Sequence, residues 1–174
     1  LTDVTRVRGG LFRSHNLAKA FDIQFLDQNN ELQHAWTTSW GVSTRMIGGV
    51  IMTHGDDKGL VIPPRLAPIQ VVIVPISKTD EERALAMEAA DNIFKSLKAA
   101  GIRVKLDDRT EVTPGFKFND WEMRGVPIRM EIGPKDVANK SVVLARRDIP
   151  GRDGKSFVSW EVLEQSVADL LVTI

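Results

Sequence analysis

The sequence predicts an α/β fold, in which a mixed sheet with elements in the order β-α-β-α-β-β-α occupies most of the chain. Residues 70–76 form a nearly continuous β-branched run, which is typical of a strand buried on both faces. Two later segments begin with helix-start signals: Thr79 precedes three acidic residues, and Thr113 precedes a proline. Strands that alternate with helices in this way indicate a layered domain with right-handed crossovers.

The elements of this domain follow from local patterns. A first helix is expected from Thr79 to residue 100 because Gly101 is a typical helix-ending residue. A second is expected from Thr113 to Gly125. The strand at residues 141–145 follows a short loop, so we expect it to be an antiparallel edge strand. The remaining elements are strands at residues 70–76, 102–106 and 127–132 and a closing helix at residues 160–171.

The first third of the chain predicts a smaller antiparallel segment. Apolar and polar residues alternate over 21–25, a turn signal follows at 27–30, and residues 32–38 can return as the second strand of a hairpin. Residues 41–52 suit a buried helix, although Gly48 and Gly49 would each cost about 1 kcal/mol relative to alanine. Residues 54–68 are rich in glycine and proline, so we expect domains at 1–66 and 67–174.

Composition narrows the class of protein. The 174 residues carry 23 basic and 23 acidic side chains, which argues against phosphate binding over the whole surface but allows a local basic patch. No cysteine is present, which excludes disulfides and thiolate metal sites and fits a cytoplasmic location. The three histidines are far apart, so we expect no metal site, and the absence of a long apolar run predicts no membrane span.

Arg45 is the cation that most needs an explanation. It adjoins the apolar stretch 46–52, and a buried guanidinium requires an anionic partner. That partner could be a phosphate or carboxylate ligand, since the planar guanidinium matches both. It could equally be Asp56 or Asp57 in a structural ion pair. Residue types alone leave both interpretations open.

A second constellation lies in the larger domain, where cations are interleaved with aromatic residues. Unpaired RNA bases require this combination, because cations neutralise phosphate and rings stack on bases. The alternative is a helix whose aromatic residues are partly in the core and whose charges are solvated. The residues concerned are Arg109, Lys117, Arg124, Arg129, Lys135, Arg146 and Arg147, with Phe116, Phe118 and Trp121, and Glu122 and Glu131 as possible acceptors for base amino groups.

Several ordered stretches resemble one enzyme family. Residues 37–57 read TTSWGVSTRMIGGVIMTHGDD, and this resembles the third signature motif of the prolyl-tRNA synthetases. Residues 58–70 resemble the junction that leads into the anticodon-binding domain of that family. TPGFKF at 113–118, GVPIR at 125–129 and GPKD at 133–136 resemble stretches of that domain. The match covers about residues 14–172 and is closest to the type without an inserted editing domain.

The resemblance implies a fold and an activity. The fold would be an anticodon-binding domain preceded by a partial class II synthetase segment of antiparallel sheet. The activity of the parent protein would be that of a proline–tRNA ligase, which joins proline to tRNA-Pro at the expense of ATP, usually with Mg²⁺. Arg45 matches the catalytic motif-three arginine that contacts the ATP phosphates. The positions that match the ATP and proline site are His15, Ser39, Trp40, Gly41, Ser43 and Arg45.

In this family the second domain reads the anticodon of tRNA-Pro, whose shared second and third anticodon bases are guanines. Arginine or lysine beside a glutamate suits guanine, which offers acceptors on one edge and a donor on another. The candidate anticodon-binding residues are therefore Arg109, Lys117, Glu122, Arg124, Arg129 and Lys135.

Departures from the family pattern limit what this chain would do alone. The first two class II motifs are missing, and four residues of the family pattern are absent after Leu17, which puts His15 in doubt as a ligand. We therefore expect a C-terminal fragment that is inactive by itself, from an enzyme that is a homodimer when intact. Two alternatives are a non-catalytic tRNA-binding accessory protein, which would have no need of Arg45, and an α/β module that binds a small molecule. The latter lacks any phosphate-binding loop motif.

Overall fold

The computed structural model describes residues 12–39, 43–77 and 79–174. The chain divides into two compact units, Leu1–Thr53 and His54–Ile174. Each unit is described by itself. The domain boundary that we expected after residue 66 lies within the second unit. It remains a prediction, because a division into compact units is not the same as a division into domains.

The first unit contains two small antiparallel sheets. The expected hairpin is present: β2 (Gln24–Leu26) pairs with β3 (Leu32–His34). The expected return strand is shorter than predicted, because residues beyond His34 form a separate strand, β4 (Thr37–Ser39), which pairs with β1 (Phe12–Ser14). Neither β1 nor the five-residue helix α1 (Asn16–Ala20) was predicted, since elements this short are too brief for a periodic pattern to register.

The motif-three helix is present but is not buried. It forms α2 (Arg45–Thr53), and none of its residues is buried. Ile47 and Met52 are 63% and 70% exposed, and a Cβ added at Gly48 or Gly49 would meet nothing within 4 Å. The expected burial and close packing are therefore wrong for this chain. The pattern identified an apolar helix correctly, but burial also requires a partner surface, which the described residues of this unit do not provide.

The second unit begins with a hairpin of two short strands, β5 (Gly55–Asp56) and β6 (Gly59–Leu60), and continues as the predicted α/β domain. Its further elements are β7 (Val71–Pro75), α3 (Asp80–Ala99), β8 (Val104–Leu106), α4 (Pro114–Met123), β9 (Ile128–Ile132), α5 (Pro134–Ala138), β10 (Ser141–Arg146), β11 (Lys155–Ser159), the 3-10 turn η2 (Trp160–Val162) and α6 (Leu163–Thr173).

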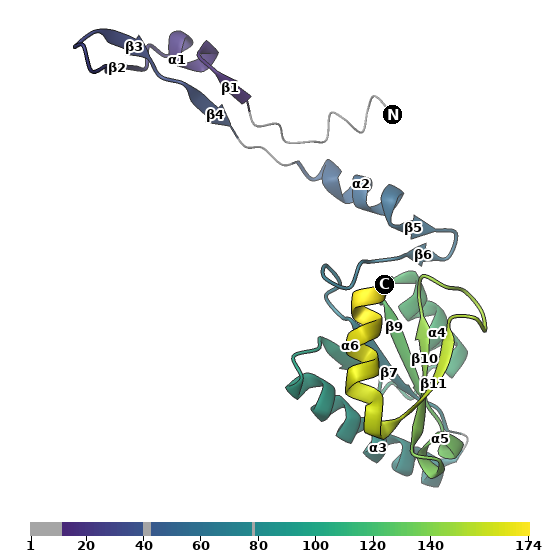
Figure 1. Ribbon diagram of the computed structural model, residues 1–174. Helices are drawn as coiled ribbons and strands as arrows, with labels where there is room; N and C mark the ends of the chain where they lie inside the picture. Colours follow the sequence, from purple (N-terminus) through teal and green to yellow (C-terminus); the bar gives the residue numbers. More distant parts are fainter. Residues whose placement is uncertain (1–11, 40–42, 78) are drawn as a thin grey trace. The chain divides into compact units, whose positions relative to one another are not determined.

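These strands form one mixed five-stranded sheet in the order β11-β10-β9-β7-β8, which confirms the predicted fold class (Figure 1). The pairs β7–β8 and β7–β9 are parallel, whereas β10 is antiparallel to both of its neighbours. The prediction that the strand at 141–145 is antiparallel is confirmed, but its placement at the edge is wrong. The edge is β11, which the sequence analysis missed because its residues, KSFVS, are mostly polar.

The two faces of the sheet carry different cores. One face packs against α3 and α6, through Val71, Ile73, Met130 and Leu144 with helix residues such as Ile93 and Val167. The other face packs Val72 and Val74 against Trp121 of α4. In this second core α4 packs on β7. On the same face of the sheet, the part formed by β10 and β11 carries other side chains. In the parts of the chain described here, no helix has the length and apolar character needed to cross a membrane.

The helix ends form as their local chemistry dictates. The side chains of Thr79 and Thr113 accept hydrogen bonds from the first turns of α3 and α4, which satisfies backbone donors left free at a helix start. Gly101 and Gly125 follow the two helices with φ of +81° and +72°, a conformation in which glycine avoids the strain that a side chain would cause. Both helices therefore begin and end at the predicted signals.

Candidate functional site

The face of the sheet beyond α4 carries charged side chains. Residues paired across neighbouring strands point to the same face, so Arg129 of β9, Ala145 of β10 and Lys155 of β11 form one row. Glu131, Val143 and Phe157 form the next row. The strand register thus places cations, one carboxylate and an aromatic ring on a single surface.

A cleft of about 290 Å³ opens on this surface, next to the C-terminal end of α4. Cations predominate among the side chains that line it, and Glu122 is the one acidic residue among them. Most of these cations are paired with carboxylates, and the positive charge that remains in excess can attract a polyanion even though the whole chain is neutral. The basic residues are Lys58, Arg129, Arg146, Arg147, Arg152 and Lys155.

Glu131 lies next to the cleft and fixes two of the cations that line it, Arg129 and Lys155. Its Oε1 accepts hydrogen bonds from Arg129 Nε at 3.1 Å and from Lys155 Nζ at 2.9 Å. Oε2 accepts a second hydrogen bond from Lys155 at 2.9 Å. Only 10% of the Glu131 side chain is exposed. The Arg129 guanidinium also lies 4.3 Å from the centre of the Phe118 ring, which favours a fixed orientation. The result is a fixed array of donors around one carboxylate.

Arg147 fixes one wall of the cleft. Its guanidinium donates to both oxygens of Asp56, at 2.8 and 2.6 Å, and its Nε donates to the backbone carbonyl of Glu122 at 2.9 Å. The hydrogen bonds from Arg147 hold the pKa of Asp56 well below its usual range. Arg147 therefore ties the β5–β6 hairpin to the end of α4 and to β10, and it is a structural part of the cleft.

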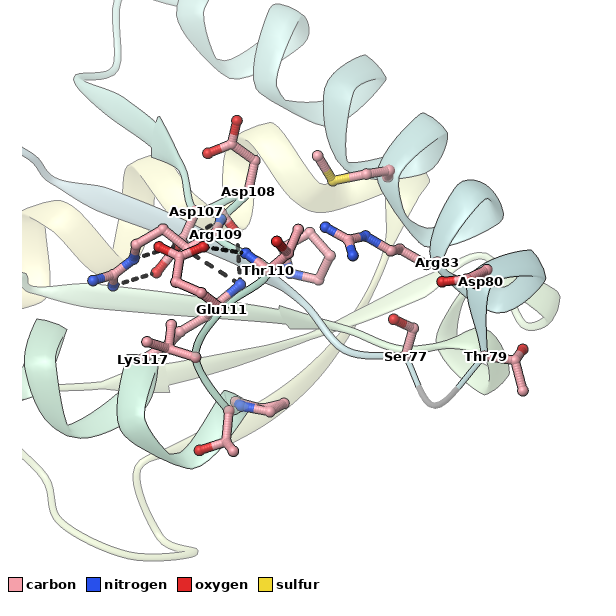
Figure 2. Close-up of a pocket in the computed structure, with 15 residues that line it drawn as sticks. Ser77, Thr79, Asp80, Arg83, Asp107, Asp108, Arg109, Thr110, Glu111 and Lys117 are labelled. Atoms are coloured by element: carbon pink, nitrogen blue, oxygen red, sulfur yellow. Dashed lines mark hydrogen bonds and ion pairs between the residues drawn. The ribbon is translucent and has the colours of Figure 1, made fainter.

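A second cleft, of about 360 Å³, lies where the parallel strands β7 and β8 end (Figure 2). Asp107 is at its base, directly after β8. The carboxylate accepts hydrogen bonds from Arg109 at 2.9 and 2.7 Å and from the indole of Trp121 at 2.7 Å. Lys117 is buried beside it and donates to the Asp107 carbonyl at 3.1 Å. Arg109 reaches Asp120 as well, at 2.9 Å.

The charged groups around Asp107 stabilise one another, as in a structural ion-pair network. Burial by itself would raise the pKa of Asp107, but the hydrogen bonds from Arg109 and Trp121 and the charge of Lys117 hold it well below its usual range. The same hydrogen bond raises the pKa of Arg109. Because Arg109 and Lys117 are engaged with Asp107, few of their donors are left for a ligand.

The six candidate anticodon-binding residues are not gathered in one place. Glu122 and Arg129 line the basic cleft, whereas Arg109 and Lys117 belong to the Asp107 network. Arg124 is exposed at the end of α4, where its side chain contacts Asp120 and the Trp121 ring. Lys135 is exposed on α5 and lines neither cleft. The structure therefore distinguishes cations with different environments that the sequence pattern had grouped together.

The candidate ATP and proline residues fall in the first unit. Trp40 and Gly41 lie outside the described residues, and Ser39 ends β4. Ser43 and Arg45 are exposed, before and at the first position of α2. His15 is half-buried with its ring centre 3.8 Å from that of Trp36. Asp56, one of the two partners considered for Arg45, is paired with Arg147 instead.

Several residues of the basic cleft were not among the candidates. Arg146, Arg147 and Glu131 were noticed as part of the cationic and acidic pattern, but Lys58, Arg152 and Lys155 were not. The available signal was the pair Arg146-Arg147 at the end of a predicted strand. Lys58 is far away in sequence, and Lys155 belongs to a strand that was not predicted, so neither could have been placed in the cleft.

The fold agrees with what similarity to known proteins shows. A family model described as an anticodon binding domain matches residues 70–163. This region is more than half of the chain and contains all five strands of the mixed sheet. The chain therefore belongs to the anticodon-binding-domain family.

The individual relatives point to a more specific group of proteins than the domain family does. The chain is 61% identical over 162 residues to a proline–tRNA ligase of Chloroflexus aurantiacus, covering 91% of this chain and 34% of the relative. It is 61% identical over 165 residues to that of Roseiflexus castenholzii, covering 92% and 34%. It is 59% identical over 148 residues to a chloroplastic/mitochondrial proline–tRNA ligase of Arabidopsis thaliana, covering 83% and 27%. The chain thus spans about a third of the length of the curated relatives it matches.

Proposed function

We propose that this chain is the anticodon-reading part of a cytoplasmic proline–tRNA ligase and that the basic cleft on the β9–β10–β11 face receives the anticodon of tRNA-Pro. The observation that carries the proposal is a cleft lined by six cations and Glu122, in which Arg129 and Lys155 are fixed by the adjacent carboxylate of Glu131. RNA readers need both parts, because cations neutralise phosphate while a small set of fixed donors and acceptors identifies a base.

The chemistry of this cleft suits guanine. Guanine offers O6 and N7 as acceptors and its exocyclic amino group as a donor. In our proposal, Arg129 and Lys155 donate to the acceptors, and Glu131 or Glu122 accepts from the amino group. Arg124 and Lys135, both exposed, contact the RNA backbone. Arg109 and Lys117 act indirectly, by holding the strand end through Asp107.

The first unit would contribute to catalysis in the complete enzyme. Arg45 is exposed, and its planar guanidinium fits the triphosphate of ATP, which supplies the energy for activating proline. No group of three potential metal-ligating side chains occurs among the described residues, so Mg²⁺ would arrive with the nucleotide. His15, Ser39, Trp40, Gly41 and Ser43 are proposed to line the same ATP and proline site, and the complete enzyme is proposed to be a homodimer.

The anticodon proposal can be tested by RNA binding at one fixed salt concentration. We expect this chain to bind tRNA-Pro and to lose about 1–3 kcal/mol for each anticodon guanine that is replaced. Glu131→Gln should reduce this preference without unfolding the domain, because the amide keeps the size of the side chain. Equal binding of the original and the replaced RNAs would contradict the proposal.

The catalytic proposal requires the complete enzyme. Proline-dependent exchange of pyrophosphate into ATP should be lost in Arg45→Ala, while binding of tRNA-Pro stays nearly unchanged. Arg65→Ala is a suitable control because Arg65 is also an exposed arginine but lies in the second unit. Normal pyrophosphate exchange by the Arg45 variant would contradict the proposed role of Arg45. Absence of exchange by the unmodified enzyme would favour an accessory tRNA-binding protein instead.

A further inference from the structure

Phe157 is the most exposed aromatic residue among the described residues, with 78% of its surface accessible. It lies in the middle of the edge strand β11. A single exposed apolar side chain is common on protein surfaces and needs no explanation by itself. The position of Phe157 relative to the basic cleft is what gives it a potential role.

The strand register fixes the face that Phe157 occupies. Side chains two residues apart on a strand point to the same side, so Phe157 shares its face with Lys155, which lines the cleft and binds Glu131. Val158 points to the opposite side and packs against the larger core. Because Val158 is held in that core, β11 cannot turn Phe157 inward without losing its own packing.

The same register sets the distance between Phe157 and the carboxylate. Phe157 is paired with Val143, and Val143 is paired with Glu131. Two strand spacings, or about 10 Å, therefore separate Phe157 from Glu131. Val143 lies between them and is only 8% exposed. Phe157 thus lies on the same face of the sheet as the Glu131 carboxylate and its two cations. Lys155 is on β11 itself, and Arg129 is two strands away on β9.

We propose that Phe157 stacks on an unpaired RNA base next to the base that Glu131 contacts. This inference rests on the proposed anticodon-reading function and adds a second contact to it. Base–aromatic stacking is a sequence-tolerant contact, because every base has a π face. Phe157 would therefore hold the loop open beside the cleft, whereas Glu131 and Arg129 would select the base.

The surroundings of Phe157 favour a base over an apolar protein partner. Interface centres that bind proteins cluster several large apolar residues and exclude water. Here the neighbours on the same face are Lys155, Val143 and Ser159, and Arg152 is exposed close by in the sequence. An exposed ring next to a cation is instead an arrangement by which proteins hold single-stranded nucleic acid.

The test measures binding of the complete 174-residue chain to an anticodon stem-loop RNA whose anticodon ends in two guanines. Phe157→Ala should weaken binding about tenfold or more, Phe157→Leu should weaken it similarly, and Phe157→Trp should preserve it. Val172→Ala is the matched control. Val172 is 89% exposed on α6, which packs on the other face of the sheet, and its removal should leave binding unchanged.

The RNA side of the experiment identifies the stacked base. Loop nucleotides are replaced one at a time by abasic sites, and each RNA is measured with the unmodified chain and with Phe157→Ala. One position should matter for the unmodified chain and no longer matter for the variant, which is the signature of a direct contact.

The possible outcomes distinguish a failure of the stacking proposal for Phe157 from a failure of the anticodon-binding proposal. Stacking is overturned if Phe157→Ala binds as tightly as the unmodified chain, if leucine serves as well as phenylalanine, or if the variant changes self-association instead of RNA binding. Guanine-dependent binding by the unmodified chain with any of these results would leave the anticodon proposal standing. If the unmodified chain does not bind the RNA, both proposals fail.

Discussion

Asp107 shows how one buried carboxylate can fix cations that a sequence pattern suggests as ligand-binding residues. Its carboxylate is almost inaccessible, with 1% exposed, and it receives donors from Arg109 and Trp121. Lys117 is buried beside it. Two cations that the sequence suggested as RNA ligands thus depend on this carboxylate. Removing the carboxylate would leave the buried Lys117 with an uncompensated positive charge, whereas Arg109 would keep Asp120 as a partner.

Asp107→Asn should therefore destabilise the chain by about 3 kcal/mol, since breaking a buried ion pair leaves an unpaired charge. Urea denaturation followed by circular dichroism measures the change. Asp108→Asn is the control: Asp108 is the exposed neighbour, and its substitution should change stability by less than about 0.5 kcal/mol. Equal effects of the two substitutions would contradict the role assigned to Asp107.

The same network predicts a dependence on pH. The folded pKa values of Asp107 and Asp56 are depressed, so their contribution is fully present above the unfolded value of about 3.9. It is lost as the pH falls below that value towards the folded pKa values. The midpoint of urea denaturation should therefore decline in acid, and it should decline less steeply in Asp107→Asn. Parallel curves for the two proteins would exclude Asp107 as a source of the acid sensitivity.

At the scale of elements, the β5–β6 hairpin shapes the cleft through close backbone contacts. A Cβ at Gly125 would lie 2.6 Å from Leu60 Cβ and 2.7 Å from the backbone of the same residue. A Cβ at Gly59 would meet the backbone of Met123 at 2.5 Å. With the bidentate pair between Arg147 and Asp56, these contacts press the hairpin against the end of α4.

Gly125→Ala should consequently lower the free energy of unfolding by more than the backbone strain at positive φ accounts for. Gly101 provides the comparison, because it also has positive φ but a Cβ there would meet nothing within 4 Å. We expect Gly101→Ala to cost about 1–2 kcal/mol, and Gly125→Ala to cost clearly more because Leu60 must also move. Denaturation of both variants measures the difference. Equal costs would mean that the hairpin does not press on Gly125.

At the scale of the whole chain, the two units differ in how they are stabilised. Both apolar clusters consist of residues between 69 and 174. In the first unit, by contrast, Ala18 is the one buried hydrophobic residue among those described. Its α2 and its β2–β3 hairpin expose large apolar side chains, including Phe25, Leu32, Ile47 and Met52. The second unit therefore has a core of its own, whereas the described residues of the first unit form none.

A chain of residues 54–174 should fold by itself, with a denaturation midpoint close to that of the complete chain. The reason is that its hydrophobic clusters, its sheet and its Arg147–Asp56 pair are all retained. A chain beginning at residue 67 is the informative comparison, since it lacks Asp56 and should be less stable. Failure of the 54–174 chain to fold would show that the first unit contributes to the stability of the second.

The sequence by itself determined the α/β class, the two long helices and the central strands of the second unit. These features are local: Thr79 and Thr113 start helices, Gly101 and Gly125 end them, and the β-branched run at 71–75 forms a buried strand wherever it is placed. The family-like stretches likewise lie in continuous segments. Such signals depend on neighbours in the chain, so they can be read without coordinates.

The tertiary structure alone decided which charged residues form the cleft. Lys58 comes from the β5–β6 hairpin, Arg129 from β9 and Lys155 from β11, and Arg147 directly follows β10. Only the register and order of the strands bring these residues together. It also decided that Lys117 is buried and that α2 is exposed. The physical reason is that burial and electrostatic pairing are properties of contacts between distant segments, whereas helix and strand signals are properties of a single segment.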